Sequence, residues 1–216
     1  MFRSLAAYLA PIAFTLLGFG LQPESAAAQT IYPFNATFSG ENTVVPFKQN
    51  ISKVTITASS TDAPYGLTRF VNTSYGLIDP STGTTVFNPD AATFGLKDLP
   101  QGNLTFFGAG NDKLFGNIIG DAKLDFQNLK ATATGTFNIT GGEGKFAGAT
   151  GTFNFLENDQ LNADPTAPFK SQALLNGSFT TPKTIPEPGN TSALIAMGII
   201  GVSLLFSHSK DKSKFA

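Results

Sequence analysis

The chain reads TGTFNIT from Thr134 to Thr140, continues as GGEGKFAGATG from Gly141 to Gly151, and resumes as TFNF from Thr152 to Phe155. The two flanking runs alternate apolar and polar residues and are rich in Thr and Phe, which is typical of half-buried β-strands. Glycines between them permit positive φ and close backbone approach, so one strand can end, turn tightly and lead into the next. We expect Phe146 and Ala149 to point inward where this connection crosses the end of a barrel. The residues expected to form the structural turn are Gly141, Gly142, Gly144, Gly148 and Gly151.

The same two-residue alternation recurs along the middle of the chain. Phe34, Ala36 and Phe38 alternate with Asn and Thr, and no long amphipathic helix interrupts the pattern. Many short strands separated by Gly, Pro, Asn and Asp predict an all-β fold, either an antiparallel β-barrel of about eight strands or a sandwich. The expected strands are 31–39, 51–59, 67–78, 84–88, 103–108, 121–128, 132–140, 150–156 and 171–181.

Three connections carry recognisable turn chemistry. Residues 79–83 (DPSTG) predict a hairpin loop, and residues 90–94 after Pro89 predict a short helical turn. The run GAGNDKLFG, residues 108–116, looks like one copy of a calcium-binding nonapeptide with Asp112 as the ligand. A second copy fails nine residues later, so we favour a hairpin with Asp112 at its tip and keep calcium there as a minor alternative.

The glycine-rich run 141–151 has the form GGxGxFxxAxG, which is similar to a run in dirigent proteins and in the allene oxide cyclase barrel group. The resemblance covers 11 residues and implies an antiparallel barrel. It carries over no catalytic residue, because the catalytic positions of those families lie elsewhere.

The first 28 residues have the order of a secretory signal peptide. Arg3 precedes an apolar stretch from Leu5 to Leu21, and Ala26 and Ala28 form a small-residue cleavage site. A permanent N-terminal anchor is the alternative. Cleavage by signal peptidase after Ala28 predicts export.

The last 31 residues combine Pro186-Glu187-Pro188, an apolar run from Ala193 to Phe206 and a lysine-containing end. The run is short for a transmembrane helix, which we place at about 192–207; a buried core helix is the alternative. This order resembles the PEP-CTERM sorting signal of exported bacterial proteins. The resemblance implies an exosortase-like processing enzyme acting near Pro186-Glu187-Pro188, transient residence in the inner membrane, and delivery to the cell surface, the exterior or an exopolysaccharide matrix.

Residues 29–185 then form the exported domain, with ten Lys and Arg against twelve Asp and Glu and sixteen Phe for a core. The charge balance gives no reason to expect nucleic-acid binding. The chain has no cysteine, and its one histidine, His208, lies in the tail, so the domain has neither thiol nor imidazole chemistry. We predict no cofactor and no enzymatic activity.

The remaining polar candidates receive structural interpretations. Glu157, Asp159 and Asp164 are expected in one solvated loop, with a calcium loop as the minor alternative. A carboxylate pair for glycoside hydrolysis is not singled out by the sequence, since its spacing depends on the fold. Tyr65, Arg69 and Tyr75 are expected to have structural roles, with a place at the barrel mouth as the alternative.

Two functions remain open. One is a non-enzymatic surface or matrix protein delivered by its two terminal signals. The other is a small-molecule-binding or isomerase-like barrel. A sealed phenylalanine interior favours the first, and an open cavity of about 300 Å³ or more with converging polar groups favours the second.

Overall fold

A computed structural model describes residues 29–183 of the 216-residue chain. The predicted signal peptide with Ala26 and Ala28, the Pro186-Glu187-Pro188 motif and the helix at about 192–207 lie outside the described residues. Within residues 29–183 no helix has the length and apolar character needed to cross a membrane.

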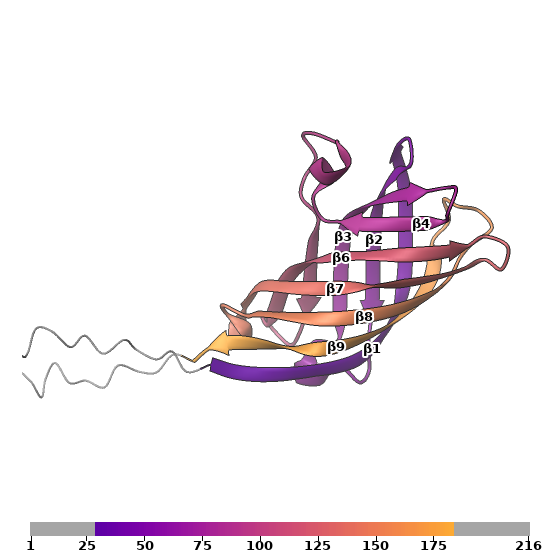
Figure 1. Ribbon diagram of the computed structural model, residues 1–216. Helices are drawn as coiled ribbons and strands as arrows, with labels where there is room; N and C mark the ends of the chain where they lie inside the picture. The colour runs from indigo at the N-terminus through magenta and orange to yellow at the C-terminus, as the bar shows by residue number, and fades with distance from the viewer. Residues whose placement is uncertain (1–28, 184–216) are drawn as a thin grey trace, which may run out of the picture. The chain divides into compact units, whose positions relative to one another are not determined.

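The described residues form nine β-strands and three short 3₁₀ turns (Figure 1). The strands are β1 (Gln29–Lys48), β2 (Ile51–Ser59), β3 (Arg69–Asp79), β4 (Thr84–Asn88), β5 (Asn103–Phe107), β6 (Lys113–Asp125), β7 (Lys130–Glu143), β8 (Thr150–Gln160) and β9 (Phe169–Pro182). The turns are η1 (Pro64–Gly66), η2 (Ala91–Phe94) and η3 (Gly144–Phe146).

The strands close into a barrel in which every pairing is antiparallel. The order is β2-β1-β9-β8-β7-β6-β4-β3-β5, and the additional pairs β2–β3 and β5–β6 complete the ring. The long strand β1 makes closure possible, because residues 29–42 pair with β9 while residues 39–48 pair with β2. Closure removes exposed sheet edges. The barrel alternative is therefore confirmed over the sandwich.

Strands β4 and β5 share one of the eight positions around the ring. Both pair with β3 on one side and β6 on the other, β4 through residues 84–88 and β5 through residues 103–107. The chain leaves the wall between them, and η2 lies in this excursion. Ala91 and Leu96 of this excursion pack with Ile51 and Tyr75 in a small separate apolar cluster.

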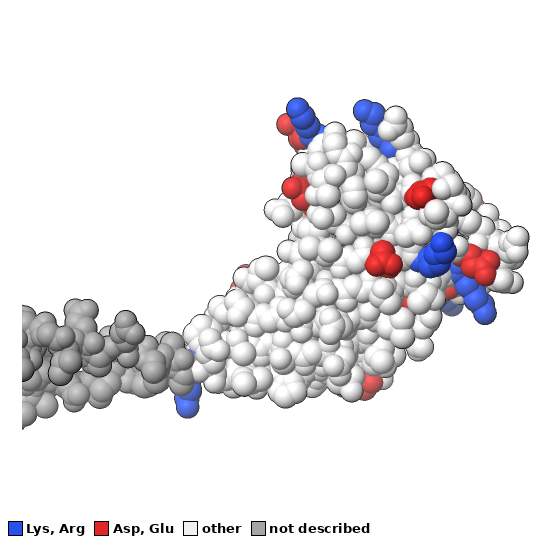
Figure 2. Space-filling view, viewed as in Figure 1, with Lys and Arg blue, Asp and Glu red and all other residues white. Residues whose placement is uncertain are grey.

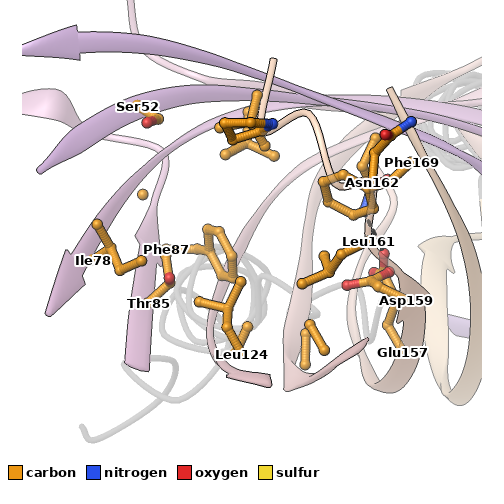
Figure 3. A pocket seen from close by; sticks show the side chains of 18 of the residues that line it. Ser52, Ile78, Thr85, Phe87, Leu124, Glu157, Asp159, Leu161, Asn162 and Phe169 are labelled. Atoms are coloured by element: carbon orange, nitrogen blue, oxygen red, sulfur yellow. Dashed lines mark hydrogen bonds between the residues drawn. The ribbon is translucent and has the colours of Figure 1, made fainter. Parts of the chain in front are cut away.

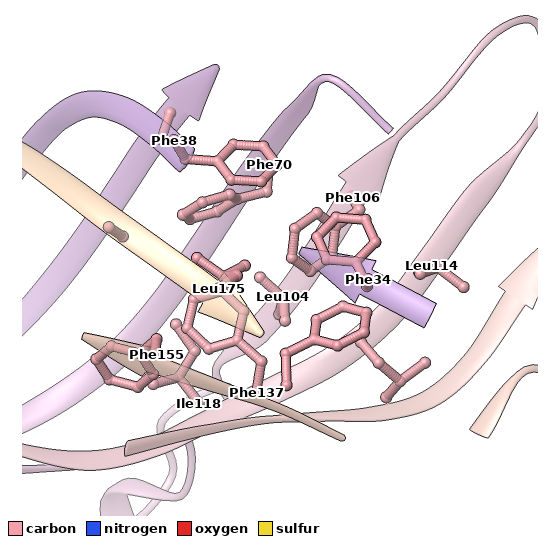
Figure 4. Close-up of a cluster of buried hydrophobic side chains, with 14 of the residues drawn as sticks. Phe34, Phe38, Phe70, Leu104, Phe106, Leu114, Ile118, Phe137, Phe155 and Leu175 are labelled. Carbon is pink, nitrogen blue, oxygen red and sulfur yellow. The ribbon is translucent and has the colours of Figure 1, made fainter. Parts of the chain in front are cut away.

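The interior is divided into a filled half and a hollow half. Phe106 lies at the centre of the filled half, with ring centroids 5.3 to 6.0 Å from those of five other phenylalanines (Figure 4). Three of these pairs, with Phe34, Phe38 and Phe153, are edge-to-face. Such pairs add about 0.5–1.5 kcal/mol each beyond burial. The phenylalanines that are almost fully buried are Phe34, Phe38, Phe70, Phe106, Phe137, Phe146, Phe153 and Phe179.

All nine predicted strands are present, and most of them differ from the prediction in their bounds. Strand β6 begins at Lys113 and ends at Asp125 instead of spanning 121–128, and β8 continues to Gln160 instead of ending at 156. The hairpin loop at 79–83 is confirmed by the Gly83 amide donating to the Asp79 carbonyl, 2.8 Å away. The predicted helical turn is η2, whose first turn is capped by the Asp90 carboxylate accepting from the Ala92 amide.

Candidate functional site

A cavity of about 540 Å³ occupies the hollow half of the barrel (Figure 3). It lies toward the end formed by the β1–β2, β3–β4, β6–β7 and β8–β9 connections, which we call the cavity end. Its wall is mostly apolar, with small residues such as Gly76, Ala122, Ala131 and Ala133 at inward positions. Small side chains on the inward face leave volume that phenylalanine fills in the other half of the barrel. The wall includes Val54, Ile118, Phe87, Leu124 and Phe155.

Strand β8 places two carboxyl groups on this wall. Its inward positions read Phe153, Phe155, Glu157 and Asp159, and each alternate residue between them faces outward. The strand thus changes from aromatic to acidic residues where it passes from the filled half to the cavity. Glu157 is 3% exposed and Asp159 is 9% exposed, and both carboxyl groups lie on the same side of the cavity in Figure 3.

The prediction of a solvated loop at Glu157 and Asp159 is therefore wrong. The alternation of 152–156 continues through residue 160, and Asp159 is paired in register with Ala131 of β7 and Ser171 of β9. Acidic residues are rare in buried strands, so local preference favours a loop at these positions. Continuing the two-residue period past Phe155 would have placed both carboxyl groups inside. Of the three acids, only Asp164 lies in the loop, where Thr166 donates to its carboxylate.

Asn42 of β1 holds the Glu157 carboxylate. Its side-chain Nδ2 donates to Glu157 Oε1 at 2.8 Å, and its Oδ1 accepts from the Ser171 hydroxyl at 3.3 Å. All three side chains are buried. This chain of hydrogen bonds joins β9, β1 and β8, which are neighbours around the ring. A buried carboxylate needs such donors, because desolvation without a partner is costly.

Asp159 lacks an equivalent partner. Its Oδ1 atom is buried and makes no hydrogen bond. Burial, then the neighbouring Glu157 charge and a hydrogen bond with the Glu157 side chain, raise the pKa of Asp159 from 3.8 to about 9. At neutral pH the Asp159 carboxyl is therefore protonated.

A smaller polar pair lies on β3. Asn72 is fully buried and donates from Nδ2 to the Ser74 hydroxyl at 3.4 Å, while its Oδ1 has no partner. Ser74 lines the cavity. In the ring order, β3 stands opposite β8, so polar groups approach the cavity from two sides.

The tyrosines and the arginine singled out in the sequence do not line the cavity. The Tyr65 hydroxyl donates to the Pro33 carbonyl at 2.8 Å, and the Tyr75 hydroxyl to the Pro100 carbonyl at 2.7 Å. The Arg69 guanidinium lies 4.2 Å from the ring centroid of Phe107. Each side chain therefore ties a loop or a neighbouring strand to the wall.

Asp112 lies in the β5–β6 hairpin and anchors the neighbouring connection. Its carboxylate accepts from the Lys145 amide at 2.9 Å and pairs with Lys145 Nζ at 2.9 Å. These contacts hold the pKa of the Asp112 carboxyl below its usual value, and the hydrogen bond from the Lys145 backbone amide contributes most. Among residues 29–183 no three potential His, Cys, Asp or Glu ligands gather at one point.

The glycine-rich connection differs in detail from the expected turn. Gly144 and Gly148 adopt left-handed backbone, with φ of +62° and +71°, while Gly141 and Gly142 lie in β7 and Gly151 lies in β8. Phe146 and Ala149 are fully buried, as predicted. The Phe146 ring packs against Tyr32 and Phe179, with centroids 5.7 and 5.2 Å away, and so closes the end opposite the cavity.

No protein-family model matches the chain, so the PEP-CTERM resemblance stays a prediction. No curated protein matches it either. The chain is similar to the solved structure of a pterocarpan synthase dirigent protein, with 12% sequence identity and a TM-score of 0.39, over 76% of this chain and 99% of that chain. Dirigent proteins are one of the two groups that residues 141–151 resemble. The similarity is too low to carry an argument about function.

Proposed function

We propose that the barrel is a binding protein for a small, largely apolar molecule, which occupies the cavity end. The observation that carries the proposal is the cavity of about 540 Å³ with the buried, unpartnered Asp159 Oδ1 on its wall. Ligand sites in proteins are typically apolar hollows of about 300–1,000 Å³ with a few placed polar groups.

The cavity is hard to explain as packing alone. Protein interiors are close-packed, and each unfilled volume lowers stability. The same barrel packs eight phenylalanines tightly in its other half, which shows that large side chains can fill an interior of this width. Placing a carboxyl group without a partner beside the unfilled volume lowers stability further. Both costs are understandable if the cavity is occupied in use.

A second candidate function is proton transfer to a bound molecule. A carboxyl group that keeps its proton at neutral pH has the property required of a general acid. The raised pKa of Asp159 favours this candidate. We place binding first, because recognition needs only the cavity and its polar wall, whereas catalysis also needs a substrate held in a reactive geometry.

The proposal includes export, which rests on the sequence alone. A signal peptide and a PEP-CTERM-like tail deliver the barrel to the cell surface or exterior, with signal peptidase and an exosortase-like enzyme as processing partners. A binding barrel in that place acts on molecules outside the cell or in a surrounding polysaccharide matrix. The membrane is a partner through the C-terminal helix until processing.

The test is binding of a neutral, environment-sensitive dye such as Nile red to the purified protein. Ala133 faces the cavity, and Ala133→Phe is expected to weaken dye binding at least tenfold by filling it. The matched control is Thr132→Phe on the exposed side of the same strand, with binding unchanged. Thermal unfolding confirms that both variants fold. Equal binding by the two variants would place the dye elsewhere and contradict the proposal.

A further inference from the structure

The charged groups at the cavity have one sign. The lining side chains include the carboxyl groups of Glu157 and Asp159 on β8 and of Asp164 in the β8–β9 connection. No lysine, arginine or histidine is among the described residues that line it. The barrel surface elsewhere carries both signs of charge (Figure 2). The titratable side chains among the described lining residues are thus all acidic.

The two buried carboxyl groups are held differently. Glu157 Oε1 accepts from Asn42, which is itself held by Ser171, so this carboxylate is fixed in place. Asp159 is nine-tenths buried and lines the cavity, and its Oδ1 has no partner. The pair therefore offers one pre-positioned carboxylate beside a carboxyl group whose Oδ1 is unpartnered.

We propose that the cavity recognises a primary ammonium group carried on an apolar body, with the ammonium donating to Asp159 and Glu157. This inference rests on the proposed binding function and names its ligand class. An ammonium has three donors and a positive charge, which compensate buried carboxylates at short range. An anionic ligand would be repelled by the Glu157 carboxylate, and a neutral ligand would leave that charge without a cation beside it.

Pairing of an ammonium group with Asp159 requires that the Asp159 carboxyl group lose its proton. In the empty barrel Asp159 holds a proton at neutral pH, because burial and Glu157 raise its pKa. When the ammonium arrives with its own proton, the Asp159 O–H bond breaks and that proton passes to solvent, leaving a carboxylate paired with a cation. Glu157 is the next inward residue on the same strand, and Ala131 of β7 and Ser171 of β9 are paired with Asp159 in register. Asn42 of β1 and Asp164 of the β8–β9 connection line the same cavity.

The experiment compares three ligands with one heptyl chain: heptylamine, heptanol and heptanoate. Calorimetric titration of the full-length protein at pH 7 in phosphate and in Tris gives the affinity and the number of protons released. We expect heptylamine to bind at least tenfold more tightly than heptanol, with release of roughly one proton per amine bound, and heptanoate to bind most weakly.

The variant Asp159→Asn is expected to remove the proton release and the preference for amine over alcohol. Asp121→Asn is the matched control, because Asp121 is exposed on β6 and its replacement makes the same carboxyl-to-amide change on the outside. Equal affinity for amine and alcohol, or an unchanged preference in Asp159→Asn, would overturn the ammonium site and leave the binding function standing. Heat from calcium chloride that Asp159→Asn abolishes would assign the pair to a metal ion instead. Absence of binding by all three ligands and by Nile red would overturn both proposals.

Discussion

The Asn42 side-chain amide donates a 2.8 Å hydrogen bond to Glu157 Oε1, although the two residues are 115 positions apart in the chain. Strand β9 lies between β1 and β8 in the ring, so the bond reaches across it. It fixes one carboxylate at the wall of the cavity. The properties of the site follow from this anchored carboxylate and from the unanchored Asp159 beside it.

Replacing Asn42 by alanine leaves Glu157 buried without this donor. We expect Asn42→Ala to lower the free energy of unfolding by about 1–3 kcal/mol, since an unsatisfied buried group keeps its full desolvation penalty. Urea unfolding followed by circular dichroism measures the change. Asn35→Ala, on the exposed side of β1, is the control and is expected to change stability by less than about 0.5 kcal/mol. Equal effects at the two positions would show that the bond has no role in stability.

The raised pKa of Asp159 sets the direction of a pH dependence. The folded state keeps this proton up to about pH 9, whereas the unfolded chain loses it near the ordinary value of 3.8. The folded state binds more protons in between, so Asp159 makes stability fall as pH rises through that window. Thermal unfolding from pH 4 to pH 9 is expected to show a flatter profile in Asp159→Asn and a higher midpoint at pH 7 to 8.

Asp164→Asn is the control for that profile. The Thr166 hydroxyl and then the Thr166 amide hold the pKa of the exposed Asp164 carboxyl below its ordinary value. Its contribution is therefore present above the unfolded pKa and is lost as pH falls. The control should alter the profile only in acid. A steep neutral-range slope that survives in Asp159→Asn would assign the effect to another group.

Two glycines of the same connection should differ sharply in their tolerance of a methyl group. A Cβ at Gly151 would meet the Ser178 carbonyl oxygen and lie 2.5 Å from Phe179 Cα, whereas one at Gly141 would find only Phe115 Cδ2 at 3.7 Å. We expect Gly151→Ala to cost about 1–3 kcal/mol or more and Gly141→Ala to be neutral or slightly stabilising. Chemical unfolding of both variants measures this, and similar costs would mean that β8 and β9 adjust to the added group.

The sorting prediction concerns the residues after the barrel. Replacing Pro186, Glu187 and Pro188 by alanine is expected to leave full-length protein in the membrane fraction, while Asn190, Thr191 and Ser192 replaced by alanine should not. Mass spectrometry of protein recovered from cells and medium locates both termini. Mature-sized protein outside the cells after the first change would show that the motif is not the processing signal.

Prediction from sequence succeeded where structure is set by neighbours in the chain. The alternation around Phe34 and Phe38 placed both rings inside, and Asp79 and Gly83 marked a turn that is present. It failed at Glu157 and Asp159, where local preference argues against acids in a buried strand. The burial of Glu157 is stabilised by the Asn42 side chain of β1, a partner that no local sequence pattern indicates.

A two-residue period predicts the strands and their inward phenylalanines, and residue types at a few consecutive positions predict the turns. The sequence alone is therefore enough to find these features. The cavity and its carboxyl pair arise from ring closure. Closure joins Asn42 to Ser171 across 129 positions of chain and to Glu157 across 115. Register between distant strands depends on the packing of the whole barrel, and so does the volume left unfilled when small residues from several strands face one another. Whether an acidic side chain meets water or a buried amide is settled by that assembly.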